Sequence, residues 1–586
     1  MAEPPHLHST TTSDGLPSFR GGGVNSLPSG VTIRTGPSMM SGPLGLGVMV
    51  TWVMPPNIGA RFPARRGISR VRSTMHTRLS LIVCGAALAA CLGERGPFTN
   101  RMAHSGTSYL ARAARQPVRW QPWGRDAFAL AAKLDRPVLL YIGSDACRWC
   151  AETDRAIYTD PAIGGLINAL FVPIRVDRDE RPDVAQRYQA AVEHLAGLHG
   201  WPLTVFLTAD GSAFFGGTYF PADDPITGRG LKQLLPEVAR SYREQRSFID
   251  QQAALVRQLV ITSNGTARGV VRAALVQEGI ASVARELENA VRTRAAAGSV
   301  MLAEATGLLL SGDTTVHAGA LRALDLMLDT TAALAGEDPP RLVRAALAGS
   351  LVRAWAATGE ARYREAGRLL VRDLANDLAD PAAQGADGAV FADQEAFVIE
   401  HALIAAATLG EAAAEKRART ALDGLLRRTY ARTWGVRHAI GDAPAAGLTA
   451  PLGMLQDQVQ VAAACLAAHQ ISNESRYLAV ALDLAAVVER RYADSLGGYY
   501  DLANAPPPPA SLPTPGDRTK HVFDDVLPGP NAEVALLFTH LARVTGDLTY
   551  RRRAKATLET FAGAMPGAGV RATTFLAAAQ ETLGTP

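Results

Sequence analysis

Two cysteines three positions apart, Cys147 and Cys150, are the residues whose types and spacing point most directly to chemistry. They follow an apolar run over 137–142 that predicts a buried strand, and they precede a helix-compatible stretch that begins near Ala151. At a helix N-terminus the unpaired N–H groups and the positive end of the dipole favour a thiolate, and a second sulfur one turn further along can close a disulfide. The pair therefore predicts a redox site.

The same pair is also compatible with half of a zinc site or with a purely structural disulfide. A four-sulfur zinc site needs a second CxxC, and the other cysteines of the sequence are only Cys84, Cys91 and Cys465. We therefore expect no metal and no cofactor at the pair, while the structural disulfide stays open as an alternative. Cys465 lies in an Ala-rich run and is expected to be a small buried apolar side chain.

A targeting signal is indicated upstream of the pair. Residues 76–78 are short and basic, residues 79–88 are apolar, and small residues precede Cys91, an order that resembles a bacterial lipobox. The apolar run is too short for a membrane-spanning helix, which needs about 20 residues. We expect a signal peptide over 75–90 and a lipid on Cys91, which would anchor the protein in the cell envelope outside the cytoplasm, at the periplasmic face or outer membrane. A buried core helix is the alternative.

Residues 1–74 are rich in Gly, Pro and Ser without sustained periodicity. We expect either a disordered leader or an extension upstream of a true start at Met75. They hold seven Arg and two acidic residues, whereas the whole chain holds 59 basic and 55 acidic residues. Without residues 1–74 the chain therefore has 52 basic and 53 acidic residues. The basic balance belongs to this leader, and we predict no nucleic-acid partner. Residues 91–117 are expected to form a linker.

Residues 118–262 alternate strand and helix patterns and are expected to form one α/β domain. The expected elements are, in order, a helix over 126–134, a strand over 137–142, the CxxC helix, a strand over 171–177, a helix over 182–195, and a hairpin of strands over 203–207 and 214–221. Asp183 lies near the N-terminus of the second long helix, where a carboxylate suits the dipole. This order is that of a thioredoxin-like domain.

Pro202 stands immediately before the third strand. In thioredoxin folds a cis proline at this place packs against the disulfide, and its neighbouring backbone pairs with a bound peptide. We therefore expect a cis bond before Pro202, with an ordinary trans proline as the alternative. Trp149 and Trp201 are expected to support the same site.

Four motifs in this region resemble the spermatogenesis-associated protein 20 family. They are C-R-W-C at 147–150, V-D-R-D-E-R-P-D at 176–183, G-W-P-L-T-V-F-L at 200–207 and F-G-G-T-Y-F-P at 215–221. The resemblance implies a thioredoxin-like domain followed by an α/α barrel similar to the six-hairpin glycosidases and acylglucosamine epimerases. It implies no defined biochemical activity.

Four positions depart from the patterns of this family and of thioredoxin. Arg148 and Ala151 stand where the family usually has histidines, so a titratable group is lost, although the guanidinium of Arg148 still favours a thiolate. His199 stands where the family tends to have glycine, and it is either a replacement acid/base near the CxxC or a plain loop histidine. Tyr141 replaces the buried acid of thioredoxin, so proton transfer from Cys150 needs another route.

From about residue 270 to 586 the sequence is Ala- and Leu-rich with helical periodicity. Three segments repeat a helix, a short polar turn and an aromatic early in the next helix, over 351–374, 461–490 and 535–561. About a dozen helices fit this length, and recurrent pairs predict an (α/α)6 toroid, with an open solenoid as the alternative. Pro528 to Asn531 resembles the family's Pro-Ser-Gly-Asn turn, and Pro506 to Pro509 marks an exposed insertion.

A helical toroid has a central pocket, and the family analogy implies a sugar-like ligand there. Candidate pocket residues near helix starts are Asp393, Glu395, Glu400, His401 and Asp457. Paired carboxylates are what glycoside chemistry needs, although solvated helix ends are the commoner role for such residues.

Three functions follow from these observations. The leading hypothesis is an exported thiol-disulfide oxidoreductase-like protein, in which Cys147 attacks a disulfide of another exported protein and Cys150 resolves the mixed disulfide. The second is a carbohydrate-binding or carbohydrate-modifying barrel with a non-catalytic thioredoxin-like module. The third is a structural lipoprotein.

Overall fold

The computed structural model describes residues 98–223, 230–263, 266–294, 299–333, 340–379, 390–440, 453–504 and 518–584. These residues fall within one compact unit. The predicted leader, signal peptide and lipidated Cys91 lie outside them, as does the proline-rich insertion. Across the described ranges, no helix combines the length and apolar character that crossing a membrane requires.

The first part of the chain forms a five-stranded mixed sheet in the order β1-β3-β2-β4-β5. Its strands are β1 (Gln121–Pro122), β2 (Val138–Gly143), β3 (Val172–Asp177), β4 (Leu203–Leu207) and β5 (Ala213–Gly217). β3 pairs in parallel with β1 and β2, whereas β4 runs antiparallel to β2 and β5. This is the predicted thioredoxin-like order, with one additional short strand at the edge.

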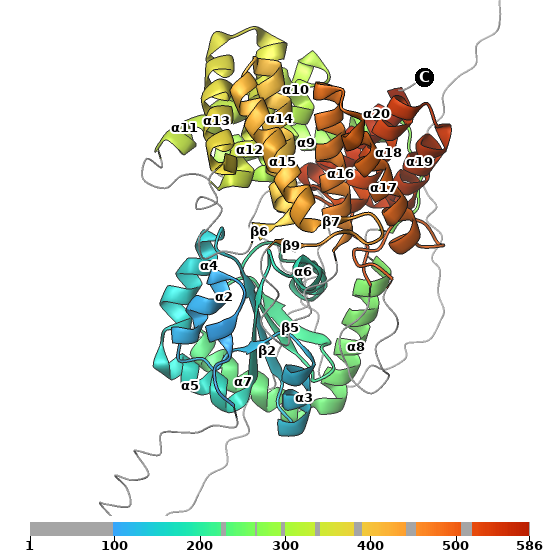
Figure 1. Cartoon of the computed structure of the whole chain (residues 1–586). Coiled ribbons are helices and arrows are strands. Elements are labelled where there is room, and N and C mark those ends of the chain that lie inside the picture. The colour runs from blue at the N-terminus through green and yellow to red at the C-terminus, as the bar shows by residue number, and fades with distance from the viewer. Residues whose placement is uncertain are drawn as a thin grey trace, which may run out of the picture. The chain divides into compact units, whose positions relative to one another are not determined.

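Helices cover both faces of this sheet (Figure 1). One face carries α2 (Ser108–Arg112), α4 (Arg148–Thr153), α5 (Pro161–Leu170) and α7 (Leu231–Glu244), and the other carries α3 (Arg125–Leu134) and α6 (Pro182–Ala196); α8 (Arg246–Ser263) contributes side chains to both cores. Along β2, Leu139 and Tyr141 enter one core, while Leu140 and Ile142 enter the other. Burial on both faces explains why the strands read as continuous apolar runs.

The predicted linker over 91–117 is wrong for residues 98–117. These residues form two 3-10 turns, Met102–His104 and Ala113–Arg115, with α2 between them. Met102, Tyr109 and Leu110 are buried in the core of the sheet's first face. The apolar residues belong to several very short elements, so they produce no periodicity that a sequence pattern could detect.

The second part of the chain forms a closed ring of six helical hairpins. The outer helices are α9 (Ala273–Thr293), α11 (His317–Ala333), α13 (Ala361–Ala379), α15 (Ala412–Thr429), α17 (Ser475–Arg491) and α19 (Leu548–Phe561). The inner helices are α10 (Val300–Leu310), α12 (Arg341–Thr358), α14 (Ala392–Leu409), α16 (Leu455–Ser472), α18 (Pro530–Thr545) and α20 (Thr573–Gly584). Each inner helix contacts the next, and α20 contacts α10, which closes the ring. The domain is therefore the predicted α/α toroid rather than an open solenoid.

Two features of the sequence favour this ring. Inner helices such as α14 and α16 bury apolar, mostly small side chains on most of their circumference, whereas outer helices such as α17 bury one face. Four of the five turns from an inner to an outer helix contain a residue with positive φ, at Gly359, Gly410, Asn473 and Gly546. Three of these turns are the repeats found in the sequence, and Gly410 marks a fourth copy.

The aromatic of the repeat makes the same contact in two of its copies. The Tyr363 hydroxyl donates to Asp325 over 3.1 Å, and the Tyr477 hydroxyl donates to Asp423 over 3.0 Å. The preceding arginine stacks on the tyrosine ring in both copies. In these two copies the tyrosine and the arginine therefore join an outer helix to the preceding outer helix, α13 to α11 and α17 to α15, which is a structural role.

Candidate functional site

The CxxC pair lies where the sequence predicts, between β2 and α4. Cys147 is the N-cap residue of α4, and its Sγ accepts a hydrogen bond from the Cys150 N–H over 3.1 Å. The two sulfurs are joined in a disulfide. A sulfur that accepts a backbone N–H at a helix start is placed to be stabilised as a thiolate when the bond is reduced.

The two sulfurs differ in accessibility. Cys147 is partly exposed, whereas Cys150 is completely buried. Trp149 between them is 63% exposed, and Arg148 is exposed as well. An incoming molecule therefore reaches Cys147, and Cys150 can react only with what Cys147 has bound.

The Trp201–Pro202 peptide bond is cis, as predicted. Pro202 is buried at the start of β4, and the Trp201 ring packs under the guanidinium of Arg178, 5.4 Å from the ring centroid. The Trp201 indole N–H is buried and has no hydrogen-bond partner in the part of the chain that the structure describes.

His199 is not placed as an acid/base for the pair. Its Nδ1 contacts the Glu193 carboxylate, and its Nε2 lies 3.9 Å from Asp525 of the helical ring. Both contacts direct the imidazole to carboxylates outside the surroundings of the CxxC pair. Of the two alternatives for His199, the structure therefore favours a plain loop histidine over an acid/base.

A buried aromatic and charged cluster lies beneath the disulfide. The Arg175 guanidinium forms two hydrogen bonds with the Asp154 carboxylate, of 2.7 and 2.6 Å, and lies 4.1 Å from the Tyr109 ring centroid. The Tyr141 hydroxyl donates to the Cys150 carbonyl oxygen over 3.3 Å. Tyr141 therefore supports the CxxC backbone, and burial raises the pKa of its hydroxyl so far that it stays protonated.

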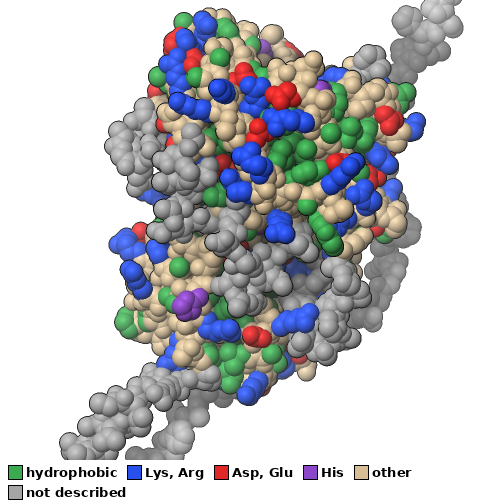
Figure 2. Space-filling model, viewed as in Figure 1, with side chains coloured by type: hydrophobic (Ala, Val, Ile, Leu, Met, Phe, Trp, Pro, Cys, Tyr) green, Lys and Arg blue, Asp and Glu red, His purple; other side chains and the backbone are tan. Residues whose placement is uncertain are grey.

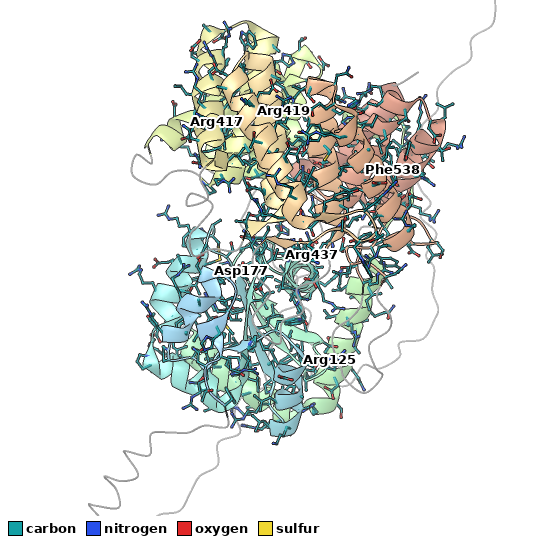
Figure 3. All side chains as sticks on the ribbon, viewed as in Figure 1. Arg125, Asp177, Arg417, Arg419, Arg437 and Phe538 are labelled. Carbon is teal, nitrogen blue, oxygen red and sulfur yellow. A yellow bond between two sulfur atoms is a disulfide. The ribbon has the colours of Figure 1, made fainter. Side chains whose placement is uncertain are left out.

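Asp177 is a residue of this site that sequence reasoning missed. It ends β3 (Figure 3). Asp177 is only 4% exposed. Burial raises the pKa of its carboxyl to about 7, and the nearby Asp179 carboxylate adds to the shift. Its position at the end of a buried strand, inside one of the four family-like motifs, is the signal that could have identified it.

A second buried cluster joins two of the predicted pocket residues in the helical ring. His438 Nδ1 lies 2.8 Å from Asp457 and 3.8 Å from Asp393, and all three side chains are buried. These groups are close enough to share a metal ion. The same geometry suits a buried imidazolium between two carboxylates: burial lowers the pKa of His438, but Asp457 and Asp393 outweigh it and raise the pKa to about 10.

Glu400 and His401 point to a third cluster, which four inner helices build together. His401 Nε2 lies 2.9 Å from Glu304 of α10, and Glu400 accepts a 2.6 Å hydrogen bond from Gln460 of α16. Glu533 of α18 is close enough for Glu400 to raise its pKa, which burial already places well above its ordinary value. Sequence reasoning identified two of these residues but missed Glu304, Gln460 and Glu533, because residues far apart in the chain form the cluster.

Glu395 is separate from both clusters of the ring. Its carboxylate forms a 3.0 Å ion pair with Arg341, and the residue is 2% exposed. It therefore holds α14 to α12.

A cavity lies beside the α/β domain and the start of the inner helices. Its lining includes Arg178, Asp179 and Trp201 from the α/β domain and Asp393, Gln456 and Asp525 from the ring. Its lining combines these polar side chains with apolar ones, and Trp201 places one wall next to Pro202.

These features define a thioredoxin-like domain with a CxxC pair, followed by an α/α toroid. Residues 99–260 match the family model Thioredox_DsbH, described as "Protein of unknown function, DUF255". Spermatogenesis-associated protein 20 of Homo sapiens is 36% identical over 150 residues, which cover 26% of this chain and 19% of that protein. Uncharacterized protein B0495.5 of Caenorhabditis elegans is 35% identical over 163 residues, 28% of this chain and 22% of that protein. In this domain the chain is similar to the spermatogenesis-associated protein 20 family.

The match spans only about a fifth of the length of these curated relatives. Among solved structures, an unsaturated glucuronyl hydrolase specific for heparin aligns with 49% of this chain and 84% of its own, at 14% identity and a TM-score of 0.38. The GH76A alpha-1,6-mannanase from Salegentibacter sp. HEL1_6 aligns with 47% of this chain and 88% of its own, at 13% identity and a TM-score of 0.34.

Proposed function

We propose that the protein is a thiol-disulfide oxidoreductase-like enzyme that acts through Cys147 and Cys150 on other proteins. The observation that carries this proposal is the asymmetry of the disulfide-bonded pair: Cys147 caps α4 and is partly exposed, while Cys150 is fully buried one turn further on. Such a pair supports attack by the accessible sulfur and resolution by the buried one.

Trapping of the mixed disulfide tests this proposal. In a Cys150→Ser variant the first attack can still occur, but the resolving sulfur is gone, so covalent adducts should accumulate and should be released by dithiothreitol. A Cys147→Ser/Cys150→Ser variant is the matched control, and a Cys465→Ser variant controls for the buried free thiol. Equal adduct yields in the Cys150→Ser protein and the double variant would exclude exchange at this pair.

We also propose that the protein works outside the cytoplasm, anchored by a lipid on Cys91, with thiols or disulfides of exported proteins as partners. The sequence 75–91 supports this location. On the face seen in Figure 2, Lys and Arg side chains are interspersed with acidic and apolar ones, which gives no support to a nucleic-acid partner. Mass spectrometry of the native N-terminus tests both points: a lipid-modified Cys91 supports the anchor, and peptides from 1–74 contradict a start at Met75.

A carbohydrate-binding or carbohydrate-modifying ring is the second candidate function. The specific observation in its favour is the cluster of Glu304, His401, Glu400 and Glu533 on separate inner helices. It pairs carboxyl groups of raised pKa, Glu400 and Glu533, with one of lowered pKa, Glu304, and such a contrast suits acid/base chemistry.

A panel of oligosaccharides separates the two candidates. Under the second function, a sugar should raise the melting temperature of the wild-type protein and of a Cys147→Ala variant equally, and a Glu400→Gln variant should lose this response. If no sugar shifts the melting temperature, this second function is not supported.

A further inference from the structure

We propose that Asp177 takes the proton from Cys150 when Cys150 resolves a mixed disulfide, and that the Tyr109 hydroxyl stabilises the resulting thiolate. This inference rests on the thiol-disulfide exchange proposed above and names the proton route within it. The sequence leaves that route open, because Tyr141 occupies the place of thioredoxin's buried acid.

The sheet register places Asp177 beside the buried sulfur. Asp177 of β3 pairs with Gly143 of β2 in a parallel ladder, so side chains at the two positions project from the same face, about 4.8 Å apart. A Cβ atom at residue 143 would overlap both the Tyr109 Oη and the Cys150 Sγ. The space left by the missing side chain of Gly143 is therefore where the hydroxyl and the sulfur approach each other, next to the carboxyl.

The Tyr109 hydroxyl is buried, and the described residues offer it no hydrogen-bond partner beyond the Tyr141 hydroxyl. The neighbouring Tyr141 hydroxyl donates instead to the Cys150 carbonyl. A buried hydroxyl without a strong acceptor destabilises the folded protein. The Cys150 thiolate, which exists only after the disulfide is reduced, would give this hydroxyl a charge-assisted acceptor.

The surroundings of Asp177 suit a group that accepts a proton and returns it. Its carboxylate accepts the Asp179 N–H over 2.9 Å and a hydrogen bond from Thr107. Burial is the largest influence and raises its pKa to about 7. The titratable and charged groups that surround it are Tyr109 on α2, Arg175 on β3, Asp154 after α4, and Arg178, Asp179 and Glu180 in the loop after β3. A carboxyl with a pKa near 7 is matched to proton transfer at neutral pH.

The Cys147 thiolate attacks a substrate disulfide, its S–S bond breaks, and one substrate sulfur leaves as a thiolate. The Cys150 thiol gives its proton to the Asp177 carboxylate and attacks Cys147 Sγ, which releases the second substrate thiolate. The proton passes from Asp177 to that leaving thiolate. Two electrons move from the cysteine pair to the substrate, so the pair ends as a disulfide and the substrate as one thiol and one thiolate, which takes its proton from water.

A small aromatic disulfide separates the two chemical steps. One equivalent of 2,2′-dithiodipyridine added to the reduced full-length protein releases one thiopyridone when Cys147 attacks and a second when Cys150 resolves. Stopped-flow absorbance follows both releases. All proteins carry Cys84→Ser and Cys91→Ser, so that the only thiol besides the pair is the buried Cys465.

At pH 7 we expect Asp177→Asn to slow the second release at least tenfold and to leave the first release unchanged. Tyr109→Phe should slow the second release severalfold. The matched control is Asp126→Asn on α3, a carboxylate whose side chain is 85% exposed, and it should change neither release. A second release at the wild-type rate in Asp177→Asn would overturn the proposal.

The pH profile of the second release and the presence of the first release also test the proposal. If Asp177→Asn does not fold, the wild-type rate of the second release must still rise with pH through about 7, as ionisation of Asp177 requires, and a flat profile from pH 5 to 8 would overturn the proposal. If the wild-type protein gives no first release, the proposed oxidoreductase function fails. A normal first release with an Asp177-independent second one leaves that function intact and removes only the proton route.

Discussion

The Nε2–H of His438 donates to the Asp179 carbonyl oxygen over 2.9 Å, although 259 positions separate the two residues. The Asp179 N–H donates in turn to the Asp177 carboxylate. One imidazole of the helical ring therefore holds the loop that supplies a hydrogen bond to the buried Asp177 carboxylate of the α/β domain.

His438→Gln should destabilise the protein in a pH-dependent way. It leaves Asp457 and Asp393 without their cation, and loss of one partner of a buried pair costs about 3–5 kcal/mol. Because the pKa of His438 is raised from 6.5 to about 10, its contribution is complete below pH 6.5 and disappears as the pH approaches 10. The variant should therefore melt at a lower temperature than wild type at pH 6.5, and the two melting temperatures should differ much less at pH 10.

The double variant His438→Gln/Asp457→Asn is the control for this prediction. Removal of one carboxylate along with the imidazole leaves less uncompensated charge, so part of the lost stability should return. A single variant whose deficit is the same at both pH values would contradict the assignment of the charge to His438.

Arg175→Lys should destabilise the α/β domain although it conserves the charge. A lysine cannot make the two parallel hydrogen bonds with Asp154 or stack on the Tyr109 ring, and Arg175 is only 1% exposed. Because lysine keeps the charge, we expect the loss in the free energy of unfolding to stay below the about 3–5 kcal/mol that removal of one partner of a buried ion pair costs. Chemical denaturation followed by circular dichroism measures it, with the exposed Arg155→Lys as control. Equal stabilities of the two variants would contradict a special role of the Arg175 pair.

Glu533→Gln should stabilise the ring at high pH. Burial and the neighbouring Glu400 disfavour the ionised carboxylate and raise the pKa of Glu533 well above its ordinary value, so ionisation lowers stability as the pH rises above about 4.3, the unfolded value. The variant should melt at a higher temperature than wild type at pH 8 and at a similar one at pH 4.

Glu581→Gln should have the opposite effect on stability, because the pKa of Glu581 is lowered whereas that of Glu533 is raised. Burial raises the pKa of Glu581, but His540 and Arg543 outweigh it and lower the pKa to about 2. Its stabilising effect is present above about pH 4.3 and is lost as the pH falls towards 2. The variant should therefore be less stable than wild type at pH 8, and the same direction of change in both variants would refute the electrostatic explanation.

Trp149→Ala should separate protein substrates from small ones. The side chain is 63% exposed beside Cys147, so its removal leaves the core intact but takes away an apolar surface that a bound protein would cover. We expect the rate of insulin reduction to fall about three- to tenfold, while the first thiopyridone release stays at the wild-type rate. Trp434→Ala in the ring, 58% exposed, is the control. Parallel losses with both substrates would indicate a damaged site instead.

His199→Gln should leave both thiopyridone releases unchanged from pH 6 to pH 8. The imidazole contacts Glu193 and faces Asp525, which directs it towards the ring. Stopped-flow profiles of the two proteins should superimpose, and a variant-specific loss near neutral pH would restore the acid/base role considered for this residue.

Local pattern predicted much of the architecture. The run over 137–142, the CxxC and Pro202 are contiguous signals, and they recur in the structure as β2, the N-terminus of α4 and the cis bond before β4. The dozen helices from α9 to α20 follow from 3.6-residue periodicity and from glycine-containing turns. The short elements over 98–117 were not predicted, because they show no periodicity in the sequence.

The sequence by itself determined which residues can do chemistry: the two cysteines, the helix start that activates one of them, and a set of carboxyl groups at helix starts in the ring. Only the tertiary structure decided which of these act together. It placed Tyr109 beside Cys150 and Asp177 opposite Gly143, paired Asp393 and Asp457 through His438, and directed His199 away from the pair. The physical reason is that a side chain's pKa and reactivity depend on burial and on charges within a few ångströms, and strand register and ring closure set those neighbours between residues far apart in the chain.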